Sequence, residues 1–535
     1  MRSPTLDFRF HPNPSRDEFR QLCGEQLTRA QALFEMLERP IDTKMAEHYV
    51  ALLDQFDSVD RNAFDLQGCT WQNFHPDQDI REEGASANKA YTAIQAAVWS
   101  SSAIVNNLLK LEKAKLDIGH LSAKLLKSWK DDLLREGALL DPGTKAQVRN
   151  LSAEIKSKAN EFTQNIGNDA TRISFDLSEL KGLPETYISD RQNHCTNGKM
   201  NISRRKADID PILSFCEVQA AREKAYRHHY NTASPVNKAV LQALLFARKK
   251  RAELLGYDSW ARFETEHTMV KSPEQVRVFL NDLRDVLEKP AAAELSKMKT
   301  LAAEEGVENF RIWDVAYGQN LLRKDALPHS DGRKATQYFS VDRAVKSLLT
   351  TIGSLLEVTF KHVESVTTWH SGVAVYHVYD AATSSESLIG RIFLDLYARR
   401  GKIEGINAFT VRKSIEGKQL GETIVSANLV DSPQGCISLE EARLIFGALG
   451  HCAHVLLARQ RFARMAGLDG VEADISGVSS QLMHSWFRDP RVFEFAVRST
   501  GFIPAESLAD MIAACEIGKA TTRIASLVAA EMSVG

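Results

Sequence analysis

Apolar residues recur every three to four positions through most of this chain, which is the spacing of one face of an α-helix. Residues 145–166 carry such a stripe, and so do residues 235–256. A third helix is expected to begin at Pro273, with Ser272 as its N-cap. Glycine and proline, which interrupt helices, number only 29 and 15 in 535 residues. The pattern therefore predicts a chain that is mainly α-helical.

Between about residues 372 and 430 the pattern changes to short runs of β-branched and aromatic residues, separated by turn residues. The runs are 373–379, 392–397, 409–411 and 423–425. Such runs are typical of strands, so we expect a small β-sheet inserted in the helical body. Residues 326–337 are rich in turn-forming residues, and we expect an exposed loop there.

Composition and charge exclude several classes of partner. With 44% hydrophobic and 25% charged residues, the chain has the balance of a globular protein. Its 67 basic and 69 acidic residues give a net charge of −2, so we expect no nucleic acid as partner. No apolar run is long enough to span a bilayer, and we expect no membrane as partner. Two basic runs, 222–229 and 399–402, are expected to be solvated surface.

The cysteines bear on the compartment. All seven are scattered and none forms a C-x-x-C pair, which favours a reducing compartment over a disulfide framework. The start of the chain carries no secretory signal. Four arginines in the first twenty residues resemble a transit peptide, but Asp7, Asp17 and Glu18 interrupt them, and such peptides are poor in acids. We expect a cytoplasmic protein, with the mitochondrion as the alternative.

The segment 444–454 resembles a zinc-peptidase helix from which most functional side chains are missing. A working H-E-x-x-H helix places two histidine ligands one turn apart and a glutamate base beside the first. When the segment is aligned on Gly450, His451 and His454, the first histidine position holds Gly447 and the glutamate position holds Ala448. Only the second ligand, His451, remains.

A helix over this segment is predicted independently by its start. Ser438 and Glu441 fit a capping box, in which each side chain binds the backbone N–H of the other residue. The helix should therefore begin after Ser438 and run past His454, with Gly447, His451 and His454 on one face.

Other segments resemble the M3 family of metallopeptidases, which contains thimet oligopeptidase and mitochondrial intermediate peptidase. They follow the family's order and are residues 253–260, 269–276, 313–317, 337–339, 393–402, 480–483 and 489–492. The resemblance is clear over residues 210–535 and faint over the first 200. It implies a mainly α, two-lobed helical ellipsoid with a deep central channel and a small sheet near the motif helix. We divide the chain into an N-terminal helical lobe, 1–205, and a degenerate, C-terminally shortened M3-like region, 206–535.

The family's third zinc ligand is a glutamate on the following helix, and the resemblance aligns it with Gly477. Two of the three ligands and the base are thus absent, because Gly447, Ala448 and Gly477 stand in their places. Catalytic zinc requires three protein ligands and an open position for water. We therefore expect no catalytic residue of a zinc peptidase, no metal and no cofactor, and the alternative is a zinc ion on the remaining histidines.

Several residues near the motif remain candidates for a cavity. His451, His454 and His484 could rebuild a metal site, with Asp474 near them in sequence, or they could be leftover histidines hydrogen-bonded to backbone or water. Cys452 could be a nucleophile beside His451, but adjacent helical residues diverge, which favours a buried, inert thiol. The glycines at the former ligand positions reflect either drift or a cavity enlarged for another ligand.

Three functions follow from these observations. The first is a catalytically degenerate homologue, not a zinc hydrolase, whose channel binds a peptide, a partner protein or a small organic ligand. The second is a repurposed, zinc-independent enzyme acting on a small organic substrate, by cyclisation or a similar reaction. The third is a residual oligopeptidase with an atypical metal site. The first requires no new chemistry, and we adopt it as the leading hypothesis.

Overall fold

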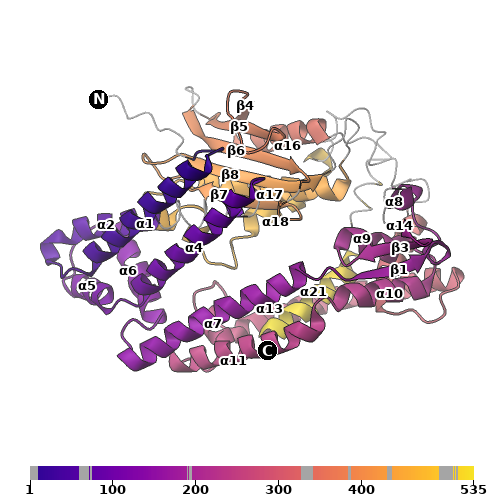
Figure 1. Cartoon of the computed structure of the whole chain (residues 1–535), viewed down its shortest axis with the longest axis horizontal. Helices are drawn as coiled ribbons and strands as arrows, with labels where there is room; N and C mark the ends of the chain where they lie inside the picture. The colour runs from indigo at the N-terminus through magenta and orange to yellow at the C-terminus, as the bar shows by residue number, and fades with distance from the viewer. Residues whose placement is uncertain are drawn as a thin grey trace. The chain divides into compact units, whose positions relative to one another are not determined.

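The computed structural model has a mainly helical chain (Figure 1). It describes residues 10–59, 71–72, 75–189, 191, 195–326, 341–382, 387–399, 401–429, 437–492, 510, 513 and 516–534. The chain forms two compact units, each with its own hydrophobic core. The first is drawn from residues 1–146, 267–269 and 332–508, and the second from residues 147–266, 270–331 and 509–535. The division after residue 205 stays a prediction.

The N-terminal helices of the first unit pack around large apolar side chains. They are α1 (Arg16–Glu38), α2 (Ala46–Val59), α4 (Gln78–Trp99), α5 (Ser102–Lys113) and α6 (His120–Arg135), with the short 3-10 helix η1 (Thr43–Met45). Leu53, Tyr91 and Trp129 are fully buried in this core. Tertiary burial of such side chains, more than helix propensity, stabilises helices of this length.

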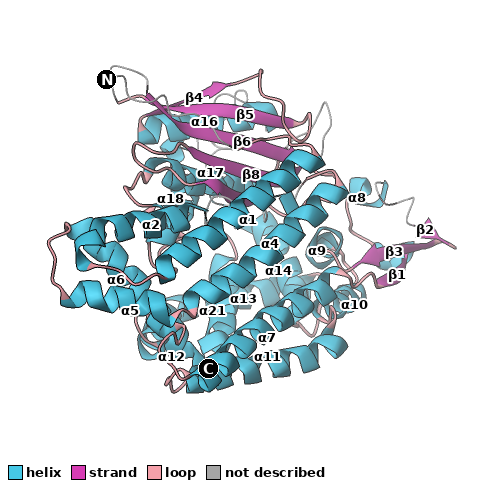
Figure 2. Cartoon of the chain, turned by 60° about the vertical axis from the view of Figure 1, so that its left-hand side comes forward, coloured by secondary structure: helices cyan, strands magenta, loops and turns pink. Residues whose placement is uncertain are grey.

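A five-stranded sheet forms the other part of the first unit (Figure 2). Its strands are β4 (Val358–His362), β5 (Val373–Asp380), β6 (Ser387–Tyr397), β7 (Asn407–Arg412) and β8 (Gly421–Leu429), in the order β4-β5-β6-β8-β7. The β6–β8 pair is parallel and the other pairs are antiparallel. The central strands β6 and β8 are buried along nearly their whole length, as strands covered on both faces are.

Helices cover both faces of this sheet. On one face, Val375, Phe393 and Ile424 share a core with Phe19 of α1 and Ile80 of α4. On the other face, α17 (Leu439–Leu457) contacts β6, β7 and β8 and lies against α16 (Val341–Leu356). The short helices η6 (Ala463–Met465) and η7 (Gly467–Gly470) follow, and then α18 (Val478–Trp486) packs on α17. The sheet thus fixes the position of the helix that carries the motif.

The second unit is helical, with one small antiparallel sheet in the order β1-β3-β2. Its elements are α7 (Pro142–Gly167), which begins in the first unit, β1 (Arg172–Asp176), η3 (Leu177–Leu180), α8 (Glu185–Ser189), β2 (Cys195–Thr196), β3 (Lys199–Ser203), α9 (Lys206–Phe215), α10 (Gln219–Tyr230), α11 (Ser234–Leu254), α12 (Trp260–Thr265), α13 (Pro273–Glu304), η5 (Ile312–Asp314), α14 (Val315–Ala326) and α21 (Lys519–Val534).

The basic run 222–229 contains a buried ion pair, contrary to the expectation of solvated surface. Arg222 and Asp314 are both fully buried, and Arg222 Nη2 lies 2.8 Å from Asp314 Oδ1. The same guanidinium donates to the carbonyl oxygens of Cys216 and Glu217. These contacts satisfy the charge, because a buried cation is tolerated where a carboxylate and further acceptors surround it.

The predicted fold class is confirmed: the chain is mainly helical, with a small sheet beside the motif helix. The stripes at 145–166 and 235–256 are α7 and α11, and α13 begins at Pro273 with the Ser272 hydroxyl accepting from Gln275 N. The four predicted runs lie within β5 to β8. The pattern missed β4 and the strands of the small sheet, which have five residues or fewer.

Two further expectations concern particular segments. The expected loop at 326–337 lies, apart from residue 326, outside the described residues. Across the described helices, none combines the length and the apolar character that crossing a membrane requires.

Candidate functional site

The motif helix α17 begins where its capping box predicts. Ser438 is the N-cap: its hydroxyl accepts from Glu441 N at 3.2 Å, and Glu441 Oε2 accepts from Ser438 N at 2.8 Å. Two of the N-terminal N–H groups that have no partner within the helix are satisfied in this way. The helix ends after Leu457, and Ala458 N donates to the carbonyl of His454. All positions of the motif therefore lie on one regular helix.

Two glycines on α17 bring α18 into close contact. A Cβ atom at Gly450 would lie 2.7 Å from the carbonyl oxygen of Ser479 and 2.5 Å from Cγ of Met483. One turn earlier, a Cβ atom at Gly447 would lie only 1.9 Å from Nε2 of His484. The obstacle at Gly450 includes backbone, whereas the obstacle at Gly447 is a side chain. The imidazole of His484 thus stands where the side chain of any residue at position 447 would begin.

The surroundings of His484 favour its neutral form. The side chain is half-buried, and its Nε2 has no hydrogen-bond partner among the described residues. Burial lowers the pKa of His484, and Arg443 and Arg488 lower it further while Glu440 acts against them. The ring therefore fills space at the centre of the motif as an uncharged group at neutral pH.

The other histidines of the motif have separate neighbours. His451 is half-buried, and its Nε2 lies 3.4 Å from the hydroxyl of Thr410 on β7. His454 is also half-buried, one turn further along the helix. Asp474 is exposed, and its Oδ1 accepts from Met269 N at 2.9 Å, so this carboxylate holds backbone in place. Gly477 is the N-cap of α18, and a Cβ atom there would meet nothing within 4 Å.

Cys452 points away from this face, into the packing between α17 and the sheet. It is fully buried and hydrogen-bonded to Thr423 of β8, and burial raises the pKa of its thiol to about 12. A thiol with that pKa carries almost no thiolate at neutral pH, and the thiolate is the nucleophilic form. Ala448 is also buried.

The described residues do not offer zinc a complete ligand set at this helix. Structural and catalytic zinc sites take at least three nitrogen, sulfur or oxygen ligands from the protein. Gly447 and Gly477 have no side-chain donor, so His451 carries the one possible ligand among these three residues. Within the ranges that the structure describes, no three His, Cys, Asp or Glu side chains are close enough together to hold a metal ion.

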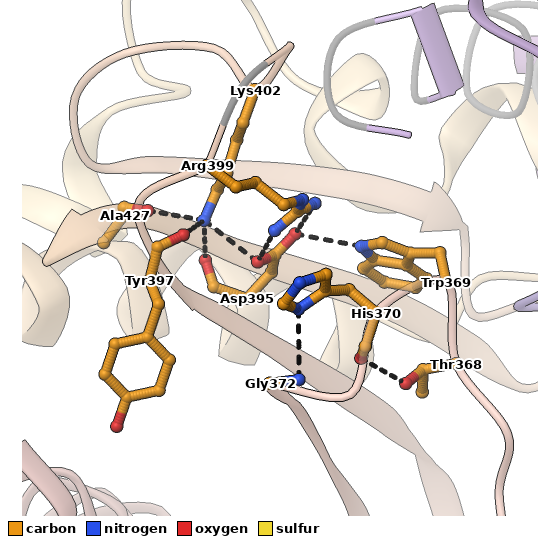
Figure 3. A network of polar contacts seen from close by, with 9 residues as sticks. All are labelled: Thr368, Trp369, His370, Gly372, Asp395, Tyr397, Arg399, Lys402 and Ala427. Carbon is orange, nitrogen blue, oxygen red and sulfur yellow. Dashed lines mark hydrogen bonds and ion pairs between the residues drawn. The ribbon is translucent and has the colours of Figure 1, made fainter. Parts of the chain in front are cut away.

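The basic run 399–402 is engaged in a buried network, which corrects the expectation that it is solvated (Figure 3). The carboxylate of Asp395 on β6 accepts two hydrogen bonds from Arg399, one at 2.9 Å from Trp369 Nε1 and one at 2.9 Å from Lys402 Nζ. Lys402 also donates to three carbonyl oxygens, one of them that of Ala427.

The charges of this network stabilise one another. Burial acts to raise the pKa of Asp395, but Arg399 and Lys402 outweigh it and the pKa is lowered. Burial lowers the pKa of Lys402, and Asp395 opposes that effect. Because the donors of Lys402 are committed to β6 and β8, we assign it to the structure of the sheet. Arg400 lies outside the described residues.

Comparisons with known proteins find sequence similarity to peptidases. Residues 212–534 match the family described as Peptidase family M3. Oligopeptidase A of Escherichia coli is 27% identical over 72% of this chain and 60% of its own length. Saccharolysin of Saccharomyces cerevisiae is 27% identical over 67% of this chain and 53% of its own. The mitochondrial intermediate peptidase of Arabidopsis thaliana is 26% identical over 82% of this chain and 65% of its own length. The match thus spans about three fifths of the first relative.

These comparisons correct the prediction about cofactors. The matched family and the relatives named above are zinc metallopeptidases, so zinc is the cofactor to be expected, and the prediction of no cofactor is wrong. The family thus leads us to expect an ion for which Gly447 and Gly477 provide no ligand.

Proposed function

The chain belongs to peptidase family M3, and from that premise we propose that it is a non-hydrolytic member that binds peptides in the channel of the family fold. The resemblance drawn from the sequence is confirmed at the level of the family. One observation carries the proposal: the ring of His484 stands against Gly447, the residue that the sequence resemblance aligns with the family's first ligand.

The chemistry of the aligned positions supports a loss of hydrolysis. A zinc ion held by three ligands would activate water for peptide hydrolysis, and a carboxylate would be needed to accept the proton of that water. The methyl group of Ala448 cannot accept a proton. An imidazole at position 447 would have to share its space with His484, since even a Cβ atom there would overlap the ring. Both changes remove steps that the reaction needs.

The integrity of the surrounding structure supports a retained role for the fold. The capping box of Ser438 and Glu441 is intact, and the buried carboxylate of Asp395 keeps its hydrogen bonds from Trp369 and Lys402. Loss of a cap or of a buried ion pair costs about 1 to 5 kcal/mol, so such features decay where nothing selects for the fold. We infer that binding continues to require the folded chain.

Peptides are the ligands that the family favours. Relatives bear the names oligopeptidase A and mitochondrial intermediate peptidase. Because this chain spans only part of their length, a peptide ligand is a proposal here. For the compartment we propose the cytoplasm, on the scattered cysteines, and the mitochondrion is the alternative that the name of the Arabidopsis relative offers. Fractionation of cells that express the tagged chain separates the two.

The proposal is tested with zinc supplied, because zinc is the cofactor that the family leads one to expect. Labelled oligopeptides of about five to fifteen residues are incubated with the protein. Cleavage is followed by mass spectrometry and binding by fluorescence anisotropy. We expect saturable binding without cleavage. Cleavage that a chelator abolishes, and that is lost in His451→Ala, would instead establish a residual oligopeptidase. If no peptide binds, the proposal that the chain retains a peptide-binding channel is wrong.

The alternatives from the sequence stay predictions. A zinc-independent enzyme acting on a small organic substrate would be indicated by conversion of a bound small molecule recovered from the purified protein. That result would be consistent with the loss of peptide hydrolysis, but the ligand would be a small organic substrate and not a peptide.

A further inference from the structure

A cavity of about 660 Å³ opens in the first unit. Its walls come from α1, from α2, from the turn between β7 and β8, and from the segment that follows α17. None of the motif residues on α17 is among the described residues that line it. Pockets for small organic ligands commonly enclose about 300 to 1,000 Å³, so the size suits one.

Part of the lining is apolar and rigid. Phe462 is 4% exposed and belongs to the core around Trp129. Val50 of α2 and Ile415 of the β7–β8 turn are also buried beside the cavity. A buried aromatic ring with aliphatic neighbours gives a ligand a surface for its hydrocarbon part. This surface is fixed before any ligand arrives, because it is part of the core.

The buried acid of the cavity is already neutralised. Asp54 Oδ2 accepts from Lys418 Nζ at 2.7 Å, and its Oδ1 accepts from Ala463 N at 2.8 Å. Asp54 is 7% exposed, so both of its oxygens are committed to the protein. Lys418 in turn donates to the carbonyl of Arg461. This pair therefore contributes little net charge to the cavity.

Two guanidinium groups in the lining have no such partner. Arg29 on α1 and Arg461 before η6 are exposed, and neither forms an ion pair with a carboxylate in the part of the chain that the structure describes. Arg461 lies with its Cζ 5.3 Å from the centre of the Phe462 ring. Arg412, by contrast, donates to Gln419 and lies 3.8 Å from Glu422 Oε1.

The charge of the lining is positive. Its described residues include four basic side chains (Arg29, Arg412, Lys418 and Arg461) against two acidic ones (Glu47 and Asp54). Guanidinium groups bind carboxylate and phosphate through pairs of parallel hydrogen bonds, and they keep their charge at any physiological pH. An anion-binding guanidinium and an aromatic surface lie side by side here, because Arg461 and Phe462 are neighbours.

We propose that this cavity is a binding site for a small organic anion, with a carboxylate or phosphate held by Arg29 and Arg461 and a ring or alkyl body against Phe462. The argument for this site uses none of the motif residues of α17 and does not depend on the peptide binding proposed above. A small anion bound here touches α1, α2 and the β7–β8 turn together, and so joins the helical and the sheet parts of the first unit.

The test is isothermal titration of the full chain with three kinds of probe: nucleoside monophosphates, aromatic carboxylates and inorganic phosphate. We expect saturable one-to-one binding of an organic anion that weakens as salt is raised, since the exposed charges are screened. The comparison of monophosphates with carboxylates identifies the oxyanion. Inorganic phosphate lacks the body that contacts Phe462 and is expected to bind at least about tenfold more weakly.

Variants assign the binding to this cavity. Arg29→Gln and Arg461→Gln are each expected to weaken binding about tenfold or more, because each removes a charged hydrogen-bond donor. Arg461→Lys keeps the charge but not the fork and should fall between Arg461→Gln and the wild type. Glu47→Gln removes the acid of the lining that has no basic partner among the described residues and should tighten binding about two- to fivefold. Arg149→Gln, at an exposed position of α7, is the matched control and should change nothing.

The outcomes separate clearly. All substituted side chains are exposed, so unchanged melting temperatures are expected and confirm folding before the titrations are compared. Binding that is equal in the wild type, Arg29→Gln and Arg461→Gln would overturn the proposal, as would the absence of binding by every probe at millimolar concentration. Inorganic phosphate binding as tightly as the organic anions would overturn the role of Phe462 and with it the organic ligand.

Discussion

Gly447 on α17 and His484 on α18 are complementary: the ring of one occupies the space that the missing side chain of the other would need. Nε2 of His484 lies 1.9 Å from the ideal position of a Cβ atom at residue 447, which is far inside van der Waals contact. A glycine at this position in a helix costs about 1 kcal/mol relative to alanine, yet here only glycine leaves room for the ring. The absence of a side chain at residue 447 and the position of His484 therefore belong to one packing arrangement.

The first prediction concerns the contribution of this pair to the free energy of unfolding. We expect Gly447→Ala to destabilise the first unit by about 1 to 3 kcal/mol, because the new methyl group displaces the imidazole. Adding His484→Ala to it should recover at least about 1 kcal/mol, and the double-mutant cycle measures that coupling by urea unfolding. Coupling near zero would show that the ring moves away freely and that the two positions are independent.

Two other glycines serve as controls for that cycle. Gly24 lies within α1, and a Cβ atom there would meet nothing within 4 Å, so Gly24→Ala should stabilise by about 0.5 to 1 kcal/mol. Gly450→Ala should destabilise as Gly447→Ala does, but His484→Ala should not rescue it, because its methyl group meets Ser479 and Met483.

The second prediction concerns rebuilding the family site. The variant Gly447→His, Ala448→Glu, Gly477→Glu supplies the missing ligands and base, but its new histidine must compete with His484 for one space. We expect this variant to bind zinc at least about tenfold more weakly than the same variant carrying His484→Ala, since displaced rings and ligands cost 1 to 3 kcal/mol. Titration against a zinc-sensitive dye measures both affinities.

An unchanged zinc affinity on removal of His484 would contradict the packing argument. Hydrolysis of an oligopeptide by the two rebuilt variants provides a second readout, and the variant with Ala448 retained is its control, since it has ligands but no base.

The third prediction concerns pH. The folded-state pKa of His484 is lowered below its ordinary value of 6.5, first by burial and then by Arg443. Well above pH 6.5 the residue is neutral in both states and has no effect on the pH dependence of stability. As the pH falls below 6.5 the unfolded chain binds the proton first, so stability decreases until the folded-state pKa is reached.

This contribution has a measurable slope. His484 adds at most about 1.4 kcal/mol per pH unit to the decline of stability below pH 6.5. The pKa is lowered in other histidines as well, namely His75, His228 and His377. The wild type is therefore compared with His484→Gln, which lacks only the contribution of His484 to the pH dependence of stability. Stability curves of the two proteins that run parallel between pH 7 and 5 would mean that the ring is solvated in the folded chain.

The fourth prediction concerns the network around Asp395. Lys402→Met removes the donor to Asp395 and to three carbonyl oxygens of the sheet, and should destabilise the first unit by about 3 to 5 kcal/mol. Chemical unfolding measures the change. Lys206→Met is the control: its ammonium is mostly exposed and pairs with Asp210 at the surface, so a change within about 0.5 kcal/mol is expected. Equal effects of the two substitutions would contradict the structural role assigned to Lys402.

Local features of this chain could be predicted from the sequence. Ser438 and Glu441 were predicted to cap the motif helix and do so, and the stripes at 145–166 and 235–256 were predicted to be helices and are. Each depends on groups within one or two turns of one another, whose relation is fixed by helix geometry. The absence of a side chain at Gly447 and of a carboxylate at Ala448 could also be read directly.

The tertiary structure decided what those positions contact. The sequence marked His484 as a candidate ligand, but the ring lies against Gly447, and Arg222 and Lys402, expected at the surface, are buried beside Asp314 and Asp395. These contacts are between residues on different elements. Which side chains meet depends on how α18 packs on α17 and how the strands of the sheet pair. The sequence by itself determined the main helices, the family and the identities of residues 447, 448 and 477, because these follow from local geometry and residue identity. Only the packed fold decided which space each side chain fills, because that depends on every neighbour at once.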